Sequence, residues 1–251
     1  MEKADYQTSW PKVLSVFVAF LVVLFLIDPF LKGLGNFALI AQEIFVIAFT
    51  LLLNSFWIHQ PLHFKTDVSL KTILGVNILP VLFVILAITI TFAKNNIDNF
   101  QSAITVAICA GVTEELVFRG IILPGSMTHF SGHRGMWYAV IISSLLFGVI
   151  HMVNLASQQL EATLLQGSNA FAVGLLLAAI YLRTRSLFFP MIFHGVNDYI
   201  STIVAHGSIT VQNRSFAPFI GQWILYLVLA IFLLRKSKTQ DIYKITKKEL
   251  F

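Results

Sequence analysis

Eight long apolar runs dominate this chain of 251 residues and leave almost no sequence for a soluble domain. A helix needs about 17–25 apolar residues to cross a bilayer. Hydrophobic residues make up 57% of the chain and charged residues only 12%, whereas soluble globular proteins are typically about 25% charged. The sequence therefore predicts an all-α fold, a polytopic transmembrane helical bundle in which residues 1–251 form a single integral-membrane domain. The eight predicted spans are Val13–Phe30, Phe37–Trp57, Thr72–Phe92, Phe100–Leu123, Trp137–Val153, Ala162–Leu182, Leu187–Val204 and Pro218–Leu234.

The basic residues outside these spans are distributed unequally between the two sides of such a bundle. Eight spans place both termini on one side, which would carry thirteen Lys and Arg residues against three on the other. Because loops rich in Lys and Arg stay in the cytoplasm, the sequence predicts a multi-pass cell-membrane protein with both termini cytoplasmic. The basic tail, residues 235–251, is expected to lie against the anionic head groups of the lipid bilayer, so the net charge of +5 gives no reason to expect a nucleic-acid partner. The thirteen are Lys3, Lys12, Lys65, Lys71, Arg134, Arg183, Arg185, Arg235, Lys236, Lys238, Lys244, Lys247 and Lys248, and the three are Lys32, Lys94 and Arg214.

Several polar residues have an ordinary structural explanation. Cys109 is the only cysteine, so no internal disulfide can form, and a small thiol packed among apolar residues is expected. Glu43 and Asn77 lie in predicted spans, where polar side chains commonly hydrogen-bond between helices. Histidines near span ends are expected at the membrane interface. These histidines are His59, His63, His129, His133 and His206.

The fourth span carries three ionisable residues that are harder to explain. An ionised side chain in the middle of a membrane costs about 2.5–3.5 kcal/mol on insertion scales, so such residues are functional candidates. Glu115 and Arg119 are four residues apart and therefore neighbours on one helix face. Glu114 lies about 100° around the helix from Glu115 and gains no partner from its own span. A second carboxylate beside an ion pair indicates chemistry rather than packing.

Two later spans carry polar residues at the same helical spacing. Phe147 and His151 form one pair, and His194 and Asp198 form the other, with Asn197 next to Asp198 on a different face. Helices that face one another can gather Glu114, His151, His194 and Asp198 around one interior point. A carboxylate and an imidazole can deprotonate a water as a general base pair. Alternatively, the four side chains can hold a divalent metal that activates the water.

Taken together, the segments EELVFR, FGVIH and HGVND resemble the three motifs of the CAAX prenyl protease and bacteriocin-processing (CPBP, or Abi) family. This family contains intramembrane proteases of the type II CAAX protease kind. The stretch YLRTRSLFFPMIFHGVND is similar to the usual approach to the family's last motif. The resemblance covers roughly residues 100–205, which would be the catalytic core.

The resemblance implies a role for each matching residue. Glu114 and His151 would activate the water that attacks a peptide bond, Glu115 and Arg119 would orient them, and His194 and Asp198 would stabilise the oxyanion. Phe147 and Asn197 would support the site. Some family members have Asn where this chain has Asp198; a carboxylate donates to an oxyanion only when protonated, which a dry apolar site can enforce. Otherwise Asp198 orients His194 or binds metal.

The function expected from this reading is an intramembrane endopeptidase that cleaves a peptide or a membrane-associated or prenylated protein near the cytoplasmic leaflet. The alternatives are a non-catalytic membrane scaffold of the same fold, serving a membrane sensor or bacteriocin self-immunity partner, and a small proton-relaying transporter. The absence of an internal repeat disfavours the transporter. No cofactor is expected, because tetrahedral zinc usually recruits His and Cys with at most one carboxylate. Zinc stays open as an alternative.

Overall fold

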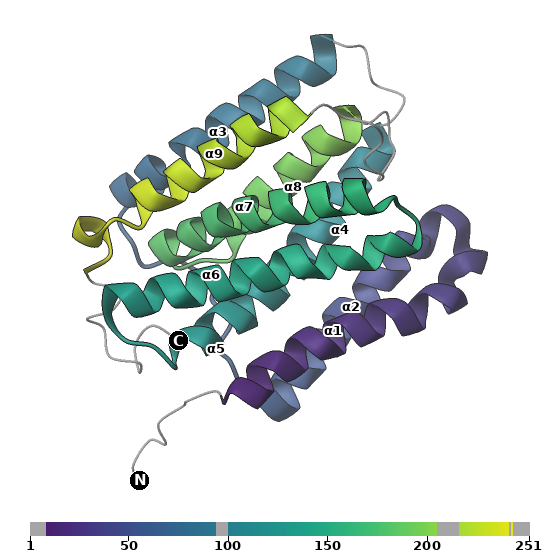
Figure 1. The fold of residues 1–251 in the computed structure, drawn as a ribbon, viewed down its shortest axis with the longest axis horizontal. Coiled ribbons are helices and arrows are strands. Elements are labelled where there is room, and N and C mark those ends of the chain that lie inside the picture. Colours follow the sequence, from purple (N-terminus) through teal and green to yellow (C-terminus); the bar gives the residue numbers. More distant parts are fainter. Residues whose placement is uncertain (1–8, 94–99, 205–215, 241, 243–251) are drawn as a thin grey trace.

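The computed structural model describes residues 9–93, 100–204, 216–240 and 242 of the chain, and these residues form an all-α bundle, as predicted (Figure 1). Two π-helical turns (Asn54–Ile58 and Phe118–Ile122) and a 3₁₀ turn (His151–Ala156) extend the α-helices. The α-helices are α1 (Trp10–Leu31), α2 (Ala38–Leu53), α3 (Leu70–Ala93), α4 (Phe100–Val117), α5 (Leu123–Met127), α6 (Gly132–Ile150), α7 (Leu160–Thr184), α8 (Phe188–Val204) and α9 (Phe216–Leu233).

Each predicted apolar run corresponds to a helical segment, but they differ in length. Among the described residues, four helical segments are long and apolar enough to cross a membrane, as expected of a multi-pass membrane protein: Trp10–Leu31, Ala38–Ile58, Gly132–Ala156 and Leu160–Thr184. Shorter apolar stretches occupy α3 and α9. That all eight segments cross the bilayer stays a prediction.

The helices of the fourth and fifth predicted spans extend beyond the predicted bounds. The helix of the fourth span continues past Leu123 through a π turn into α5 and ends at Met127. The Leu123 amide donates to the Phe118 carbonyl in this turn. Pro124 is the second residue of α5, directly after this turn, and it has no N–H to donate to the preceding turn. The fifth span begins at Gly132 rather than at Trp137.

Successive helices run in opposite directions, so the connections that carry most of the Lys and Arg residues lie at one end of the bundle. We call this end the basic end. Lys12 Nζ donates to the Trp57 carbonyl at 2.8 Å, which joins the start of α1 to the end of the second span. Trp10 stacks on His129, and His133 Nδ1 lies 3.2 Å from Thr239 Oγ1. His59 and His63 lie in the connection between the second span and α3. His206, the loops at 95–99 and 208–215, and most of the basic tail lie outside the described residues.

The connection between α7 and α8 is tied to the connection before α3. Arg185 ends α7 in the left-handed conformation (φ 54°). Ser186 Oγ donates to the Phe64 carbonyl at 2.6 Å, and Thr66 Oγ1 donates to the Thr184 carbonyl at 2.5 Å. The Arg-Thr-x-Ser-Leu stretch before the third motif therefore fixes the start of α8 against a second loop.

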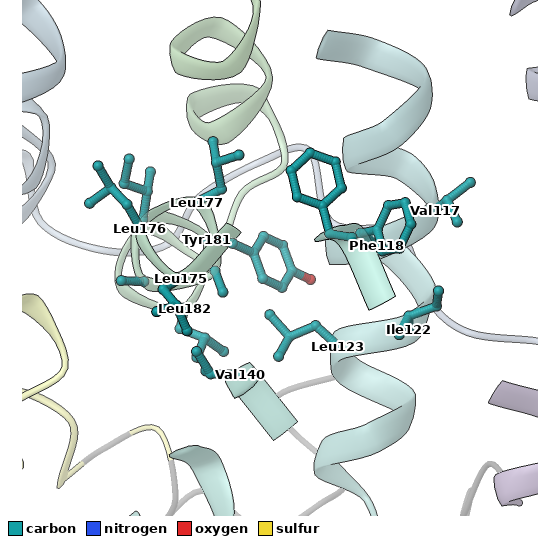
Figure 2. Packing of buried hydrophobic residues seen from close by; sticks show 14 of the residues in the cluster. Val117, Phe118, Ile122, Leu123, Val140, Leu175, Leu176, Leu177, Tyr181 and Leu182 are labelled. Atoms are coloured by element: carbon teal, nitrogen blue, oxygen red, sulfur yellow. The ribbon is translucent and has the colours of Figure 1, made fainter. Parts of the chain in front are cut away.

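Helix α7 is the centre of the bundle. In the apolar window of α7, 67% of the residues are buried, against 17% in the second span. In Figure 1, α7 lies between the α3–α9 edge and the α1–α2 edge. Figure 2 shows buried side chains of α7 packed beside those of α6 and of the segment that joins α4 to α5: Leu175, Leu176, Leu177, Tyr181 and Leu182 with Val117, Phe118, Ile122, Leu123 and Val140. We call these residues the basic-end core, because they fill the bundle between its middle and its basic end and none of them is more than 3% exposed.

Candidate active site

A buried network joins three helices at the middle of the bundle. Glu115 Oε1 on α4 accepts from Arg119 Nη1 at 2.7 Å and lies 2.9 Å from His194 Nδ1 on α8. Arg119 Nη2 donates to the Gly174 carbonyl on α7 at 3.1 Å. Glu115 and Arg119 are fully buried. The predicted pairing of these two residues is confirmed, and the same carboxylate also orients the His194 ring.

Glu114 points away from this network into a cavity. Its side chain is 22% exposed, whereas that of Glu115 is 0% exposed. Glu114 Oε2 lies 3.6 Å from His194 Nε2, and Asp198 Oδ2 lies 3.4 Å from the same nitrogen. The two nitrogens of His194 therefore face different surroundings: Nδ1 is held by the buried Glu115, and Nε2 faces the cavity carboxylates.

His151 reaches the same cavity from the end of α6. Its Nδ1 lies 2.9 Å from the Phe147 carbonyl. A carbonyl can only accept, so Nδ1 carries the hydrogen and Nε2 is left with its lone pair. The Phe147 ring makes edge contacts with His151 and His194, each at 5.4 Å between ring centres. Arg119 also lies over the Phe147 ring, with Cζ 4.5 Å from its centre. Phe147 thus separates the two imidazoles and covers the buried cation.

Asn197 lies on the cavity wall, but its hydrogen bonds reach α9. Its Oδ1 accepts from Tyr226 Oη at 2.5 Å and from Gln222 Nε2 at 3.3 Å. Because Tyr226 is fully buried, these bonds anchor the middle of α8 to α9. The contact between Asn197 and α9 could not be read from the motif, since it depends on how α9 packs.

Glycines set the close approach of the helices that carry the site. A Cβ on Gly111 of α4 would lie 3.0 Å from the Gly195 amide nitrogen, and a Cβ on Gly195 of α8 would lie 2.8 Å from the Ala107 carbonyl oxygen. Small residues allow such backbone contact between helices in membranes. Gly111 precedes Glu114 by one helical turn and Gly195 follows His194, so the contact places the carboxylate beside the imidazole.

The cavity has a volume of about 310 Å³, which is at the lower end of the range for ligand pockets. It brings together all four predicted catalytic residues, Glu114, His151, His194 and Asp198, on one lining. Sequence reasoning missed most of its other polar residues. These are Gln42 of α2, Asn154 of the 3₁₀ turn, Gln166 and Asn169 of α7, and Ser201 and Thr202 of α8.

Two minor expectations need correction, and a third is not decided. Cys109 is not packed in the interior but is half-buried on the cavity wall. Glu43 lines the same cavity as Glu114, and its hydrogen bond between helices stays a prediction. Asn77 Nδ2 donates to the Ile73 carbonyl of its own helix at 2.8 Å, not to a neighbouring helix. Helical spacing alone does not decide which faces of α2, α3 and α4 line a cavity.

The donor set does not have the arrangement of a metal centre. Within the part of the chain that the structure describes, no group of three or more His, Cys, Asp and Glu side chains is placed to hold a metal ion. The four candidate ligands supply two imidazoles, His151 and His194, and two carboxylates, Glu114 and Asp198, whereas tetrahedral zinc usually recruits His and Cys with at most one carboxylate. We therefore derive no step through a metal.

Comparison with known families identifies the part of the chain that carries this site. Residues 96–200 match the sequence model of a family described as type II CAAX prenyl endopeptidase Rce1-like. These residues form a domain of the Rce1-like CPBP family. The matched range contains the EELVFR, FGVIH and HGVND segments, so the predicted resemblance is confirmed. No curated protein and no solved structure matches the chain. Membership of the Rce1-like family implies an intramembrane protease and a peptide substrate.

Proposed function

We propose that this protein is an intramembrane endopeptidase that hydrolyses a peptide bond of a peptide or membrane-associated protein with a water activated by Glu114 and His151. The observation that carries the proposal is the separation of the two adjacent glutamates. Glu115 is fully buried with Arg119 and His194, while Glu114 faces a cavity shared with His151 and Asp198. One carboxylate thus has a fixed structural partner, and the other is available to a substrate.

The proposed reaction uses the residues in the following way. Glu114 accepts a proton from the water as its oxygen attacks the carbonyl carbon, and the His151 Nε2 lone pair holds the second water hydrogen. His194 Nε2 and the protonated carboxyl group of Asp198 donate hydrogen bonds to the oxygen on which negative charge develops, because an ionised Asp198 would repel that oxygen. When the intermediate collapses, the C–N bond breaks and Glu114 returns its proton to the leaving amine. Glu115 keeps the His194 ring in position throughout.

The test is turnover by the purified protein in liposomes, with a library of membrane-associated peptides as substrate. Wild-type protein is expected to cleave a subset of these peptides, and Glu114→Gln is expected to lower turnover by at least about 100-fold, as loss of a general base does. Glu161→Gln is the matched control, since Glu161 is exposed in the first turn of α7. Equal turnover in wild type and Glu114→Gln would contradict the proposal, and a cellular phenotype that survives the substitution would select a scaffold.

A further inference from the structure

The cavity extends to one side of the candidate catalytic residues along the bundle. The lining residues of α4 lie before or at Glu114, those of α7 lie in its first half, and those of α8 begin at His194. These parts of α4, α7 and α8 lie toward the end of the bundle opposite the basic end. The cavity therefore extends from the candidate catalytic residues away from the basic end, toward Gln42 on α2 and Asn154 after α6.

The other side of the catalytic residues is closed. The basic-end core begins two residues after Glu115 on α4, at Val117, and two residues after Val173 on α7, at Leu175, and it contains Phe118, Leu123 and Tyr181 (Figure 2). Every one of its residues is at most 3% exposed. None of the residues of this core lines the cavity that contains Glu114. A substrate that reaches Glu114 through the cavity must approach from the other end or from the membrane.

One wall of the cavity has the chemistry that a peptide backbone needs. Gln166, Asn169, Ala170 and Val173 follow one face of α7 at helical spacing and all line the cavity. Asn154 Nδ2 donates to Gln166 Oε1 at 2.9 Å, which fixes one end of this wall. The Oδ1 atom of Asn169 is buried and has no hydrogen-bond partner among the described residues.

An unpaired buried amide oxygen is unfavourable and is rarely kept without a reason. A primary amide offers both an acceptor and donors, so it can bond the N–H and C=O groups of an extended chain whichever way it is oriented. An apolar ligand would leave the Asn169 amide unpaired, whereas a peptide backbone would satisfy it.

From this direction and this chemistry we propose that the substrate is an extended peptide segment that enters from the end opposite the basic end and is held by the amide wall of Asn154, Gln166 and Asn169. Since the charge distribution places the basic end in the cytoplasm, the substrate is presented from the non-cytoplasmic side. With entry from this side, we no longer expect cleavage near the cytoplasmic leaflet. The identity of the substrate as a cleaved peptide rests on the proposed function, but the route does not.

The route can be tested without turnover, because Cys109 is the only cysteine and lines the cavity. Intact cells and inside-out vesicles that contain the wild-type protein are treated with a membrane-impermeant maleimide, and a reporter fused after Lys238 marks the side of the basic end. Labelling of Cys109 only from the side opposite the reporter is expected. Cys109→Ala gives the blank, and Asn154→Cys in that background supplies a second position farther along the cavity.

Each other labelling pattern overturns the route. Labelling of both positions from the reporter's side would place the opening at the basic end. Labelling by a membrane-permeant maleimide alone would place it within the bilayer. Failure of both reagents at both positions would mean that the cavity is not open in the membrane.

The amide wall is tested by binding of a peptide that the wild type cleaves, measured by fluorescence anisotropy in the inactive Glu114→Gln background. Asn169→Leu is expected to weaken binding by about 3- to 10-fold, as loss of one or two hydrogen bonds does. Ser168→Ala is the matched control, because Ser168 is exposed and its hydroxyl bonds to its own helix. Equal binding by Asn169→Leu in the Glu114→Gln background and by Glu114→Gln alone would show that the amide wall does not hold the peptide. The proposed function would still stand. Failure of the wild type to bind or cleave any peptide overturns both.

Discussion

Glu114 and Glu115 are adjacent in the chain, yet their substitutions are expected to have different consequences. Glu115→Gln leaves Arg119 without its carboxylate in a fully buried site and also removes the charged partner of His194. Breaking a buried ion pair typically destabilises a protein by about 3–5 kcal/mol. Glu114→Gln removes only the longer contact of Glu114 Oε2 with His194 Nε2, at 3.6 Å, and the Glu114 side chain is 22% exposed. Thermal melts in one detergent should therefore show a large loss of stability for Glu115→Gln and a small one for Glu114→Gln.

The double substitution Glu115→Gln with Arg119→Gln provides a control for this comparison. Removing both charges should recover part of the stability that Glu115→Gln loses, because the unpaired cation is then gone. If Glu114→Gln melts as low as Glu115→Gln, the assigned division of roles between the two carboxylates is wrong.

Asp198 distinguishes the metal-free reaction from a metal-dependent one. In the metal-free reaction, Asp198→Asn should keep or raise the turnover rate, because a neutral amide can still donate to the oxyanion. In a metal site, the same substitution removes an anionic ligand and should lower metal content and rate together. The measurements are turnover and bound metal for wild type and Asp198→Asn, with and without a chelator.

We expect turnover to be insensitive to chelation. An enzyme that loses activity on chelation, regains it when zinc returns and is inactivated by Asp198→Asn would contradict the metal-free reaction. Asn197→Asp is a useful comparison, since Asn197 bonds to Tyr226 and Gln222 on α9 and not to the catalytic residues.

The contacts within one helix were predictable from spacing, and those between helices were not. The pairing of Glu115 with Arg119 follows from four residues of separation, whereas the contact between Glu115 and His194 joins residues 79 positions apart. Gln166 and Asn169 look like ordinary interfacial residues near the start of a span. Only the packing of α7 against the 3₁₀ turn reveals that they line a cavity.

At the scale of the helices, the contact between α4 and α8 sets the distance between Glu114 and His194. In Gly195→Ala the new Cβ would lie 2.8 Å from the Ala107 carbonyl oxygen, so the two helices must move apart. Overpacking of this kind typically destabilises by about 1–3 kcal/mol, and turnover should fall by more than the loss of stability explains, because small misplacements of catalytic groups are costly. Melting temperature and turnover of the same preparation give the two values.

Gly221→Ala on α9 is the matched control, since nothing lies within 4 Å of its Cβ position. Alanine is the better helix former by about 0.8–1 kcal/mol, so this variant should be as stable as the wild type or slightly more stable. A Gly195→Ala protein that matches it in both stability and turnover would show that the close contact is not needed.

Helix positions were predicted well from the apolar runs, but their boundaries and relative arrangement were not. The continuation through Pro124 to Met127 depends on a π turn that has no sequence signal of its own. The tie between Ser186 and the Phe64 carbonyl joins two loops that are distant in the chain. The Arg-Thr-x-Ser-Leu stretch indicated a family resemblance, and its physical role became visible only with the loop that it contacts.

For the whole molecule, the charge count predicts the orientation in the membrane. A reporter fused after Lys238 should be cytoplasmic, and one inserted at Asn95, which lies outside the described residues, should be on the opposite side. Protease protection of both fusions in spheroplasts measures this directly. Reporters on the same side would contradict the number of spans, and exchanged sides would contradict the orientation.

The confinement of the Glu115–Arg119 ion pair to one stretch of helix has a consequence for biosynthesis. Gly174 and His194, the other partners in this network, lie 55 and 79 residues farther along the chain than Arg119 and Glu115, so they are made later by the ribosome. When the fourth span leaves the translocon, its two buried charges do not yet have these partners on α7 and α8. The local pair lets them neutralise one another at once, and the nascent chain can enter the lipid before the helices that complete the site exist.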